Sequence, residues 1–189
     1  MKRRVIIVTD GDKRAQEAIE IATTNIGGRC ISLSGGNPTT LTGSEIIELI
    51  KMAKYDPVVV MVDDRGDNGM GKGELAMDVI MNNKDIELMG IVAVASNTPN
   101  AVGVKVDCSI DKHGNKISKA VDKCGNVLEN KVVIGDTVNI LADADLPYVV
   151  GIGDPGKMDG NDSCDIGSPV VTKALEEIIE KYNGKLMKV

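Results

Sequence analysis

Aspartates follow several of the short apolar segments of this 189-residue chain. Asp10 and Asp12 come after the first apolar run, Asp63 and Asp64 after a later one, and Asp154 after the last. Crowded carboxylates raise one another's pKa values, and a hard cation with oxygen ligands is the usual way to neutralise them. We therefore predict a Ca²⁺ or Mg²⁺ site formed by Asp10, Asp12 and Asp63 or Asp64. The alternative is that these aspartates are helix N-caps and solvated turn residues.

A second set of polar residues is placed to contact a ligand. Loops at the carboxyl ends of parallel strands converge where the strand order reverses, and ligands bind there. We predict ligand-binding roles for Asp154, Lys157, Ser96 and Asn97, which lie in such loops. No catalytic residue is predicted, because the single histidine, His113, falls in a turn and leaves no credible pair of nucleophile and base.

Two glycine-rich stretches match known motifs only in part. Read as a calcium-binding EF-hand loop, residues 63–74 have Arg65 where an oxygen ligand is required. Read as a phosphate-binding loop, residues 66–72 fit G-x-x-x-x-G-K, but Gly73 stands where a Ser or Thr should hold Mg²⁺. The other interpretation is a polar lid loop. Residues 151–156 match G-x-G-x-x-G, yet they continue into a loop near the C-terminus instead of opening an early helix.

Short β-branched runs alternate with amphipathic stretches of helical period, which is typical of a parallel sheet covered by helices. We predict a single α/β domain over residues 1–189, built as a three-layer open sheet of about five mainly parallel strands with helices on both faces. The layout is flavodoxin-like or Toprim-like, with strand order 2-1-3-4-5. The expected strands are 4–9, 30–33, 57–62, 88–95 and 147–152, and the expected helices are 13–26, one from about 44, one through 75–80, one from 136 and one over 168–182.

Residues 102–134 have a different pattern, in which apolar and polar side chains alternate. Turn sequences within them, Asp111–Asn115 and Asp122–Asn126, indicate hairpins. We therefore predict an antiparallel β flap inserted into the α/β domain at about 102–134.

Composition excludes several classes of function. The 22 Lys and Arg against 28 Asp and Glu give a net charge of −6, which disfavours nucleic-acid binding. No apolar run approaches the roughly 20 residues of a membrane-spanning helix, so we expect a soluble protein. The four cysteines have no zinc or disulfide spacing, which favours a reduced, cytosol-like compartment. The apolar stripe of the last helix is typical of core packing, although such a stripe can equally form a homodimer interface.

Seven segments, in order along nearly the whole chain, resemble the soluble stage V sporulation protein AE family of spore-forming Firmicutes. They are Val8–Asp12, Gly27–Ser32, Gly36–Thr39, Tyr55–Val58, Ala93–Thr98, Gly135–Val138 and Gly151–Asp154. The resemblance implies membership of the operon whose products move dipicolinic acid, with calcium, into the developing spore and release it during germination. It also implies other sporulation transport-complex subunits as partners and a cytoplasmic or spore-associated location, peripheral to the spore inner membrane. It supplies no catalytic or binding residues.

Three functions stay open at this point. The first is a non-enzymatic accessory protein that docks to partner subunits and binds Ca²⁺ or calcium dipicolinate, since the metal can bridge protein carboxylates to the pyridine dicarboxylate. The second is a metal-dependent phosphoryl-transfer or hydrolytic enzyme that uses the predicted aspartates as ligands. The third is an interaction module without a ligand.

Overall fold

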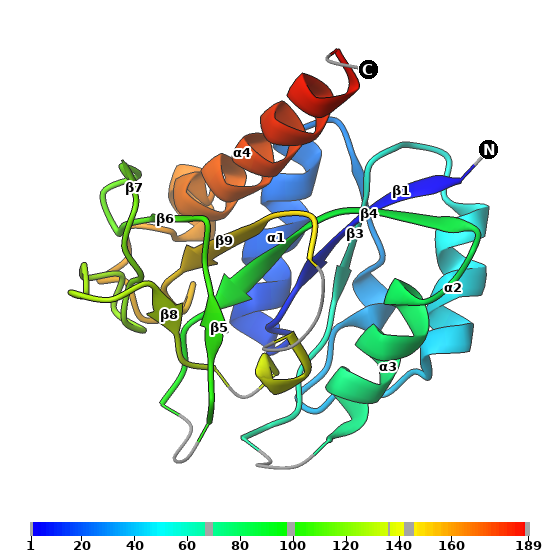
Figure 1. Cartoon of the computed structure of the whole chain (residues 1–189), viewed down its shortest axis with the longest axis horizontal. Coiled ribbons are helices and arrows are strands. Elements are labelled where there is room, and N and C mark those ends of the chain that lie inside the picture. The colour runs from blue at the N-terminus through cyan, green and yellow to red at the C-terminus, as the bar shows by residue number, and fades with distance from the viewer. Residues whose placement is uncertain (1, 67–69, 98–100, 136, 142–145, 188–189) are drawn as a thin grey trace.

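The computed structural model describes residues 2–66, 70–97, 101–135, 137–141 and 146–187, and it confirms the predicted α/β class. A seven-stranded, mostly parallel sheet lies between helices on its two faces (Figure 1), and a two-stranded antiparallel sheet stands beside it. The elements are β1 (Arg3–Val8), α1 (Lys13–Asn25), β2 (Arg29–Cys30), α2 (Gly43–Met52), β3 (Val58–Met61), α3 (Lys72–Met81), β4 (Ile86–Val94), β5 (Val104–Lys105), β6 (Cys108–Ile110), β7 (Lys116–Ile117), β8 (Val132–Val133), β9 (Val149–Ile152) and α4 (Pro169–Leu186), with 3-10 helices at Ser32–Ser34, Asn139–Leu141 and Cys164–Ile166.

The strand order is β2-β3-β1-β4-β9-β6-β7, so the expected order 2-1-3-4-5 was right to place β2 at the edge and wrong in the positions of β1 and β3, which are exchanged. β3 lies between β2 and β1, in parallel register with β1 from Val5 opposite Val58 to Val8 opposite Met61. All four residues of β3 are buried, whereas β2 is two residues long and carries the exposed Arg29. A charged, short strand suits a sheet edge, and a wholly apolar strand suits the interior.

The helices divide into two layers. α1 and α4 contact each other on one face of the sheet, and α2 and α3 contact each other on the opposite face (Figure 1). For α1, α2 and α3 this division follows from right-handed crossovers, because the chain moves in one direction from β1 to β2 and in the other from β2 through β3 to β4. α4 follows the last strand, β9, and packs beside α1. Buried methionines such as Met61, Met77 and Met89 supply the core volume that aromatic residues usually provide.

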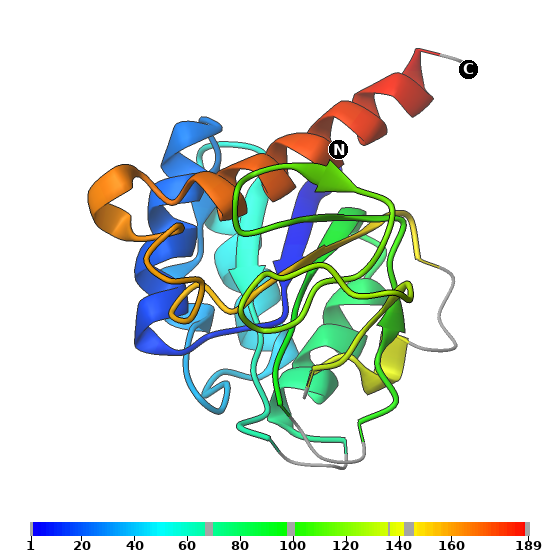
Figure 2. The same ribbon diagram turned by 90° about the vertical axis from the view of Figure 1, so that its left-hand side faces the viewer.

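Residues 102–134 do more than form a flap. β6 pairs in parallel with β9, and β7 pairs antiparallel with β6, so this segment extends the main sheet. β5 and β8 make a separate antiparallel pair, and Val121 and Val127 form an isolated antiparallel bridge. Figure 2 views the molecule from this side, with the looped segments in front of the sheet. On the sheet's outer part, Glu177 of α4 accepts hydrogen bonds from Lys116 Nζ at 2.5 Å and from Tyr148 Oη at 3.2 Å, which joins α4 to β7 and to the residue before β9.

Two expected elements differ in extent. The second strand, expected at 30–33, ends at Cys30 and passes into the 3-10 helix Ser32–Ser34, where the buried Ser34 Oγ accepts a hydrogen bond from Met61 N at 2.8 Å. The helix expected from 136 is the single 3-10 turn Asn139–Leu141, and Asp136, its expected first residue, lies outside the described residues.

Candidate functional site

A cavity of about 130 Å³ lies where β1, β3, β4 and β9 end. It contains six of the eight residues predicted from the sequence to bind a metal or ligand. The lining residues are Thr9, Asp10, Asp12, Asn37, Asp63, Val94, Ala95, Ser96, Asp154 and Lys157. The carboxyl ends of four parallel strands thus bring together side chains that are up to about 150 positions apart in the chain.

Asp10 and Asp12 are held by the turn that joins β1 to α1. Asp12 is the N-cap of α1, and its Oδ1 accepts hydrogen bonds from Arg14 N at 2.8 Å and Ala15 N at 2.9 Å. Its own N–H donates to Asp10 Oδ1 at 3.3 Å. Gly11 lies between them, and a Cβ there would come within 2.8 Å of Gly36 O, so this turn requires glycine. The predicted alternative, that the aspartates are caps, is confirmed for Asp12.

Asp63 is fixed by backbone bonds to a neighbouring loop. Its N–H donates to Thr39 Oγ1 at 2.8 Å, and its carbonyl oxygen accepts from Thr39 N at 2.8 Å. Its carboxylate Oδ1 accepts a hydrogen bond from Arg65 N at 2.8 Å. Asp63 is 4% exposed, so its carboxylate is nearly removed from bulk water at the cavity wall.

Asp154 and Lys157 form an ion pair at the wall of this cavity. The Lys157 ammonium lies 2.5 Å from Asp154 Oδ2, and this contact raises the pKa of Lys157. Asp154 Oδ1 accepts from Gly156 N at 2.8 Å, while Asp154 N donates to Lys123 O at 2.9 Å. The turn around Lys123 belongs to residues 102–134, so that segment positions one wall of the cavity.

The cavity has a surplus of negative charge. Among the described residues it is lined by four carboxylates, those of Asp10, Asp12, Asp63 and Asp154, and by one ammonium, that of Lys157. Burial raises the pKa of Asp10 well above its usual range, and the negative charges of Asp12, Asp63 and Asp154 raise it further. Ionisation of Asp10 is therefore unfavourable in the absence of a cation.

Two predicted residues do not reach the cavity. Asp64 is fully buried, and its Oδ1 accepts a hydrogen bond from Gly73 N at 2.6 Å in the first turn of α3. Its Oδ2 accepts from Glu74 N at 3.1 Å, so Asp64 caps α3 from outside the helix. Asn97 is exposed at the end of the loop after β4 and is absent from the cavity wall. Sequence reasoning missed Thr9 and Asn37 as lining residues, although both lie within segments that it had singled out, Val8–Asp12 and Gly36–Thr39.

Asp162, another aspartate of the C-terminal loops, serves the N-terminus of α4. Its Oδ1 accepts from Val170 N at 2.7 Å and Val171 N at 3.2 Å, whereas its buried Oδ2 has no hydrogen-bond partner among the described residues. Burial raises the pKa of Asp162 to about 6.

Asp162→Asn is expected to raise the free energy of unfolding at neutral pH by about 1–2 kcal/mol. The folded protein binds the Asp162 proton more tightly than the unfolded chain, whose aspartates titrate near about pH 3.9. Wild-type stability from this group is therefore greatest below about pH 4 and is lost as the pH rises to about 6. Urea unfolding at several pH values measures this; a pH slope of stability that stays unchanged in the Asp162→Asn chain contradicts it.

The remaining candidate sites have simple structural roles. His113 is exposed, and its backbone N–H donates to Asp111 Oδ1 at 2.8 Å within a turn. Among the residues described, no three or more His, Cys, Asp or Glu side chains are grouped as a metal site, and this includes the carboxylates of the cavity. No helix of the described chain is long and apolar enough to span a bilayer. A carboxylate has about four lone-pair directions, so carboxylates such as those of the cavity can accept several hydrogen bonds or bind a cation.

A family model described as stage V sporulation protein AE1 matches residues 4–182. A search of curated proteins found no significant match, and neither did a search of solved structures. The family match covers the seven-stranded sheet except its first residue, the helices except the last four residues of α4, and every residue that lines the acidic cavity.

Proposed function

Because the chain belongs to the stage V sporulation protein AE1 family, and is therefore a sporulation-related protein, we propose that it is a non-enzymatic accessory protein of calcium dipicolinate movement. In this proposal the acidic cavity binds Ca²⁺, alone or as its dipicolinate complex. The protein docks to other subunits of the transport complex in the cytoplasm or at the spore inner membrane. It acts during sporulation and germination.

The observation that carries this proposal is that four carboxylates line one cavity, with one ammonium among its described lining residues. The four are not grouped as a metal site in this structure, so a bound ion would have to draw their oxygens together. Carboxylate oxygens are the ligands that Ca²⁺ prefers, and Ca²⁺ tolerates irregular coordination completed by water. Asp10 would be the central ligand: burial is the main cause of its raised pKa, and neighbouring negative charges, which a cation would neutralise, raise it further.

Dipicolinate fits the proposal only together with the metal. The free dianion would be repelled by the four carboxylates, whereas a bound Ca²⁺ can accept protein oxygens on one side and the pyridine dicarboxylate on the other. Lys157, exposed at the cavity rim and paired with Asp154, is placed to contact a carboxylate of the incoming dianion. Ser96, also in the cavity wall, would supply a neutral hydrogen-bonding group.

Isothermal titration of the purified protein tests the proposal. CaCl₂ is expected to bind, dipicolinate without metal is expected not to bind, and dipicolinate is expected to bind once Ca²⁺ is present. Asp10→Asn is expected to weaken Ca²⁺ binding at least tenfold. Asp165→Asn, on an exposed residue outside the cavity, is the matched control with the same charge change.

Two results would overturn the proposal. One is the absence of both heat and thermal shift with Ca²⁺ and with Mg²⁺. The other is hydrolysis of phosphoesters in the presence of Mg²⁺ or Mn²⁺ that disappears in Asp10→Asn, which would instead establish a metal-dependent enzyme.

A further inference from the structure

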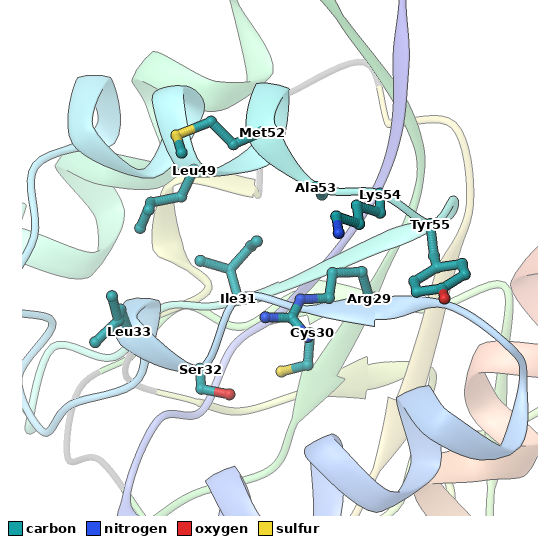
Figure 3. A pocket seen from close by; sticks show the side chains of 10 residues that line it. All are labelled: Arg29, Cys30, Ile31, Ser32, Leu33, Leu49, Met52, Ala53, Lys54 and Tyr55. Carbon is teal, nitrogen blue, oxygen red and sulfur yellow. The ribbon is translucent and has the colours of Figure 1, made fainter.

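A second concave site lies at the opposite edge of the sheet from residues 102–134, which we call the looped segment, and between edge strand β2 and helix α2. Its volume is about 460 Å³, within the range of pockets that hold ligands. Figure 3 shows Leu33, Leu49 and Met52 at one end and Arg29 with Lys54 at the other. None of its lining residues belongs to the acidic cavity.

The apolar end of this cleft is unusually open to solvent. Leu33 is 68% exposed and Met52 is 77% exposed, and both lie beside the partly buried Leu49. Large apolar side chains that gather around a hollow with a polar rim are typical of interaction sites. A partner side chain inserted here would cover surface that the fold itself leaves in water.

The other end carries positive charge only. Arg29 and Lys54 are the charged residues among those lining the cleft, and neither forms a salt bridge within the described part of the chain. The protein as a whole has a net charge of −6, so this local excess of cations is not a reflection of overall composition. This positively charged end of the cleft is complementary to the carboxylates of a binding partner.

Strand β2 also offers backbone groups. Arg29 N and Ile31 N donate to Pro57 O and Val59 O of the neighbouring strand. Because successive residues of a strand direct their backbone groups to opposite edges, the N–H and C=O of Cys30 face away from β3. β2 is the end of the sheet, so no further strand among the described residues covers them. An extended peptide could therefore pair with this edge.

We propose that the cleft between β2 and α2 docks an extended acidic peptide segment of a partner protein. An apolar side chain of the peptide occupies the space between Leu33, Leu49 and Met52, its carboxylates pair with Arg29 and Lys54, and its backbone bonds to Cys30. A lipid surface fits less well, because hydrocarbon has no hydrogen-bonding groups for an uncovered strand edge.

Selection from a displayed library of random peptides, about seven residues long as befits a short strand, tests this proposal on the full chain. The expected result is enrichment of sequences that combine Asp or Glu with Leu, Ile or Val. The best enriched peptide is then measured by fluorescence anisotropy. Arg29→Glu with Lys54→Glu is expected to weaken binding at least tenfold, as is Met52→Asp. N-methylation of the peptide backbone is expected to weaken it as well.

The matched control is Lys105→Glu with Lys131→Glu, which makes the same charge change at two exposed lysines of the looped segment. It is expected to bind the peptide as the unaltered chain does. Circular dichroism and thermal melting confirm that each variant is folded. Binding should also persist in EDTA, so a failure here is distinguishable from a failure of the acidic cavity to bind calcium.

Several results would overturn the proposal. These are no peptide enrichment, enrichment of basic or wholly apolar sequences, or binding that survives the Arg29 and Lys54 reversals. Two further results assign the surface to another occupant: binding to vesicles of equal phosphatidylglycerol and phosphatidylcholine that depends on Arg29 and Lys54, or self-association that Met52→Asp abolishes.

Discussion

Replacing Asp64 with alanine is expected to lower the free energy of unfolding by about 3 kcal/mol. The N-cap of α3 is Gly71, which has no side chain to accept from the first-turn N–H groups. Asp64 supplies that acceptor from seven positions earlier, through its bonds to Gly73 N and Glu74 N. Alanine would leave two donors unsatisfied in a buried place and would remove a favourable interaction with the positive end of the helix.

Asp64→Asn separates the two parts of this effect. The amide keeps an acceptor oxygen for the N–H groups but removes the negative charge, so we expect a loss about half as large. Gly71→Ala is expected to be destabilising as well, because its Cβ would collide with the Asp64 carboxylate. Urea denaturation measures all three variants, with Asp165→Ala on the exposed surface as the control, expected to change stability by less than about 0.5 kcal/mol. Equal stability of wild type and the Asp64→Ala chain contradicts this account.

The different positions of Asp63 and Asp64 show where sequence reasoning reached its limit. Because both residues directly follow a strand, the sequence correctly predicted the edge of the sheet at which they lie. Successive side chains of an extended chain point to opposite sides, however, so only one of two neighbours can enter a given cavity. Asp63 faces the cavity, and Asp64 turns towards α3. Which of the two side chains turns towards α3 depends on the path of the chain around Gly71. The pattern of strands in the sequence gives no information about that path.

The order of the strands was also only partly predictable from the sequence. Alternation of strands and helices predicted the class of fold and the convergence of Asp10, Asp12, Asp63 and Asp154, because those depend only on parallel strands meeting at one edge. It placed β2 at the edge, which suits its exposed Arg29, but it did not distinguish whether β1 or β3 lies next to β2. β1 and β3 are both largely buried apolar strands, so their sequences do not show that β3 pairs with β2 and β1 with β4.

The looped segment was the least predictable part. Its alternating pattern correctly indicated antiparallel pairing, as found for β5 with β8 and for β6 with β7. The parallel pairing of β6 with β9 joins Cys108 to Val150, and no local pattern encodes contacts between residues so far apart in the chain. The same long-range packing places the Lys123 carbonyl oxygen on Asp154 N, so a wall of the cavity depends on a segment that looked like an independent insertion.

Calcium affinity is expected to rise about tenfold for each pH unit until Asp10 is fully ionised, and one proton is expected to leave the protein for each ion bound. The reason is the raised pKa of Asp10, which keeps this carboxyl protonated over a pH range where ordinary aspartates are ionised. Ca²⁺ requires the ionised form, so binding must displace the proton. Titration calorimetry from about pH 5 to about pH 8, in buffers of different ionisation enthalpy, measures both the affinity and the proton count.

Asp10→Asn is the variant that isolates this coupling. It removes the titrating group while keeping a neutral oxygen donor, so residual Ca²⁺ binding should be weaker and nearly independent of pH in this range. The same substitution should raise the melting temperature at pH values where wild-type Asp10 is forced to ionise, because the unfolded chain loses that proton more easily than the folded one. A wild-type affinity that does not change with pH, or a proton count of zero, would show that Asp10 does not contact the ion and that any calcium site lies elsewhere.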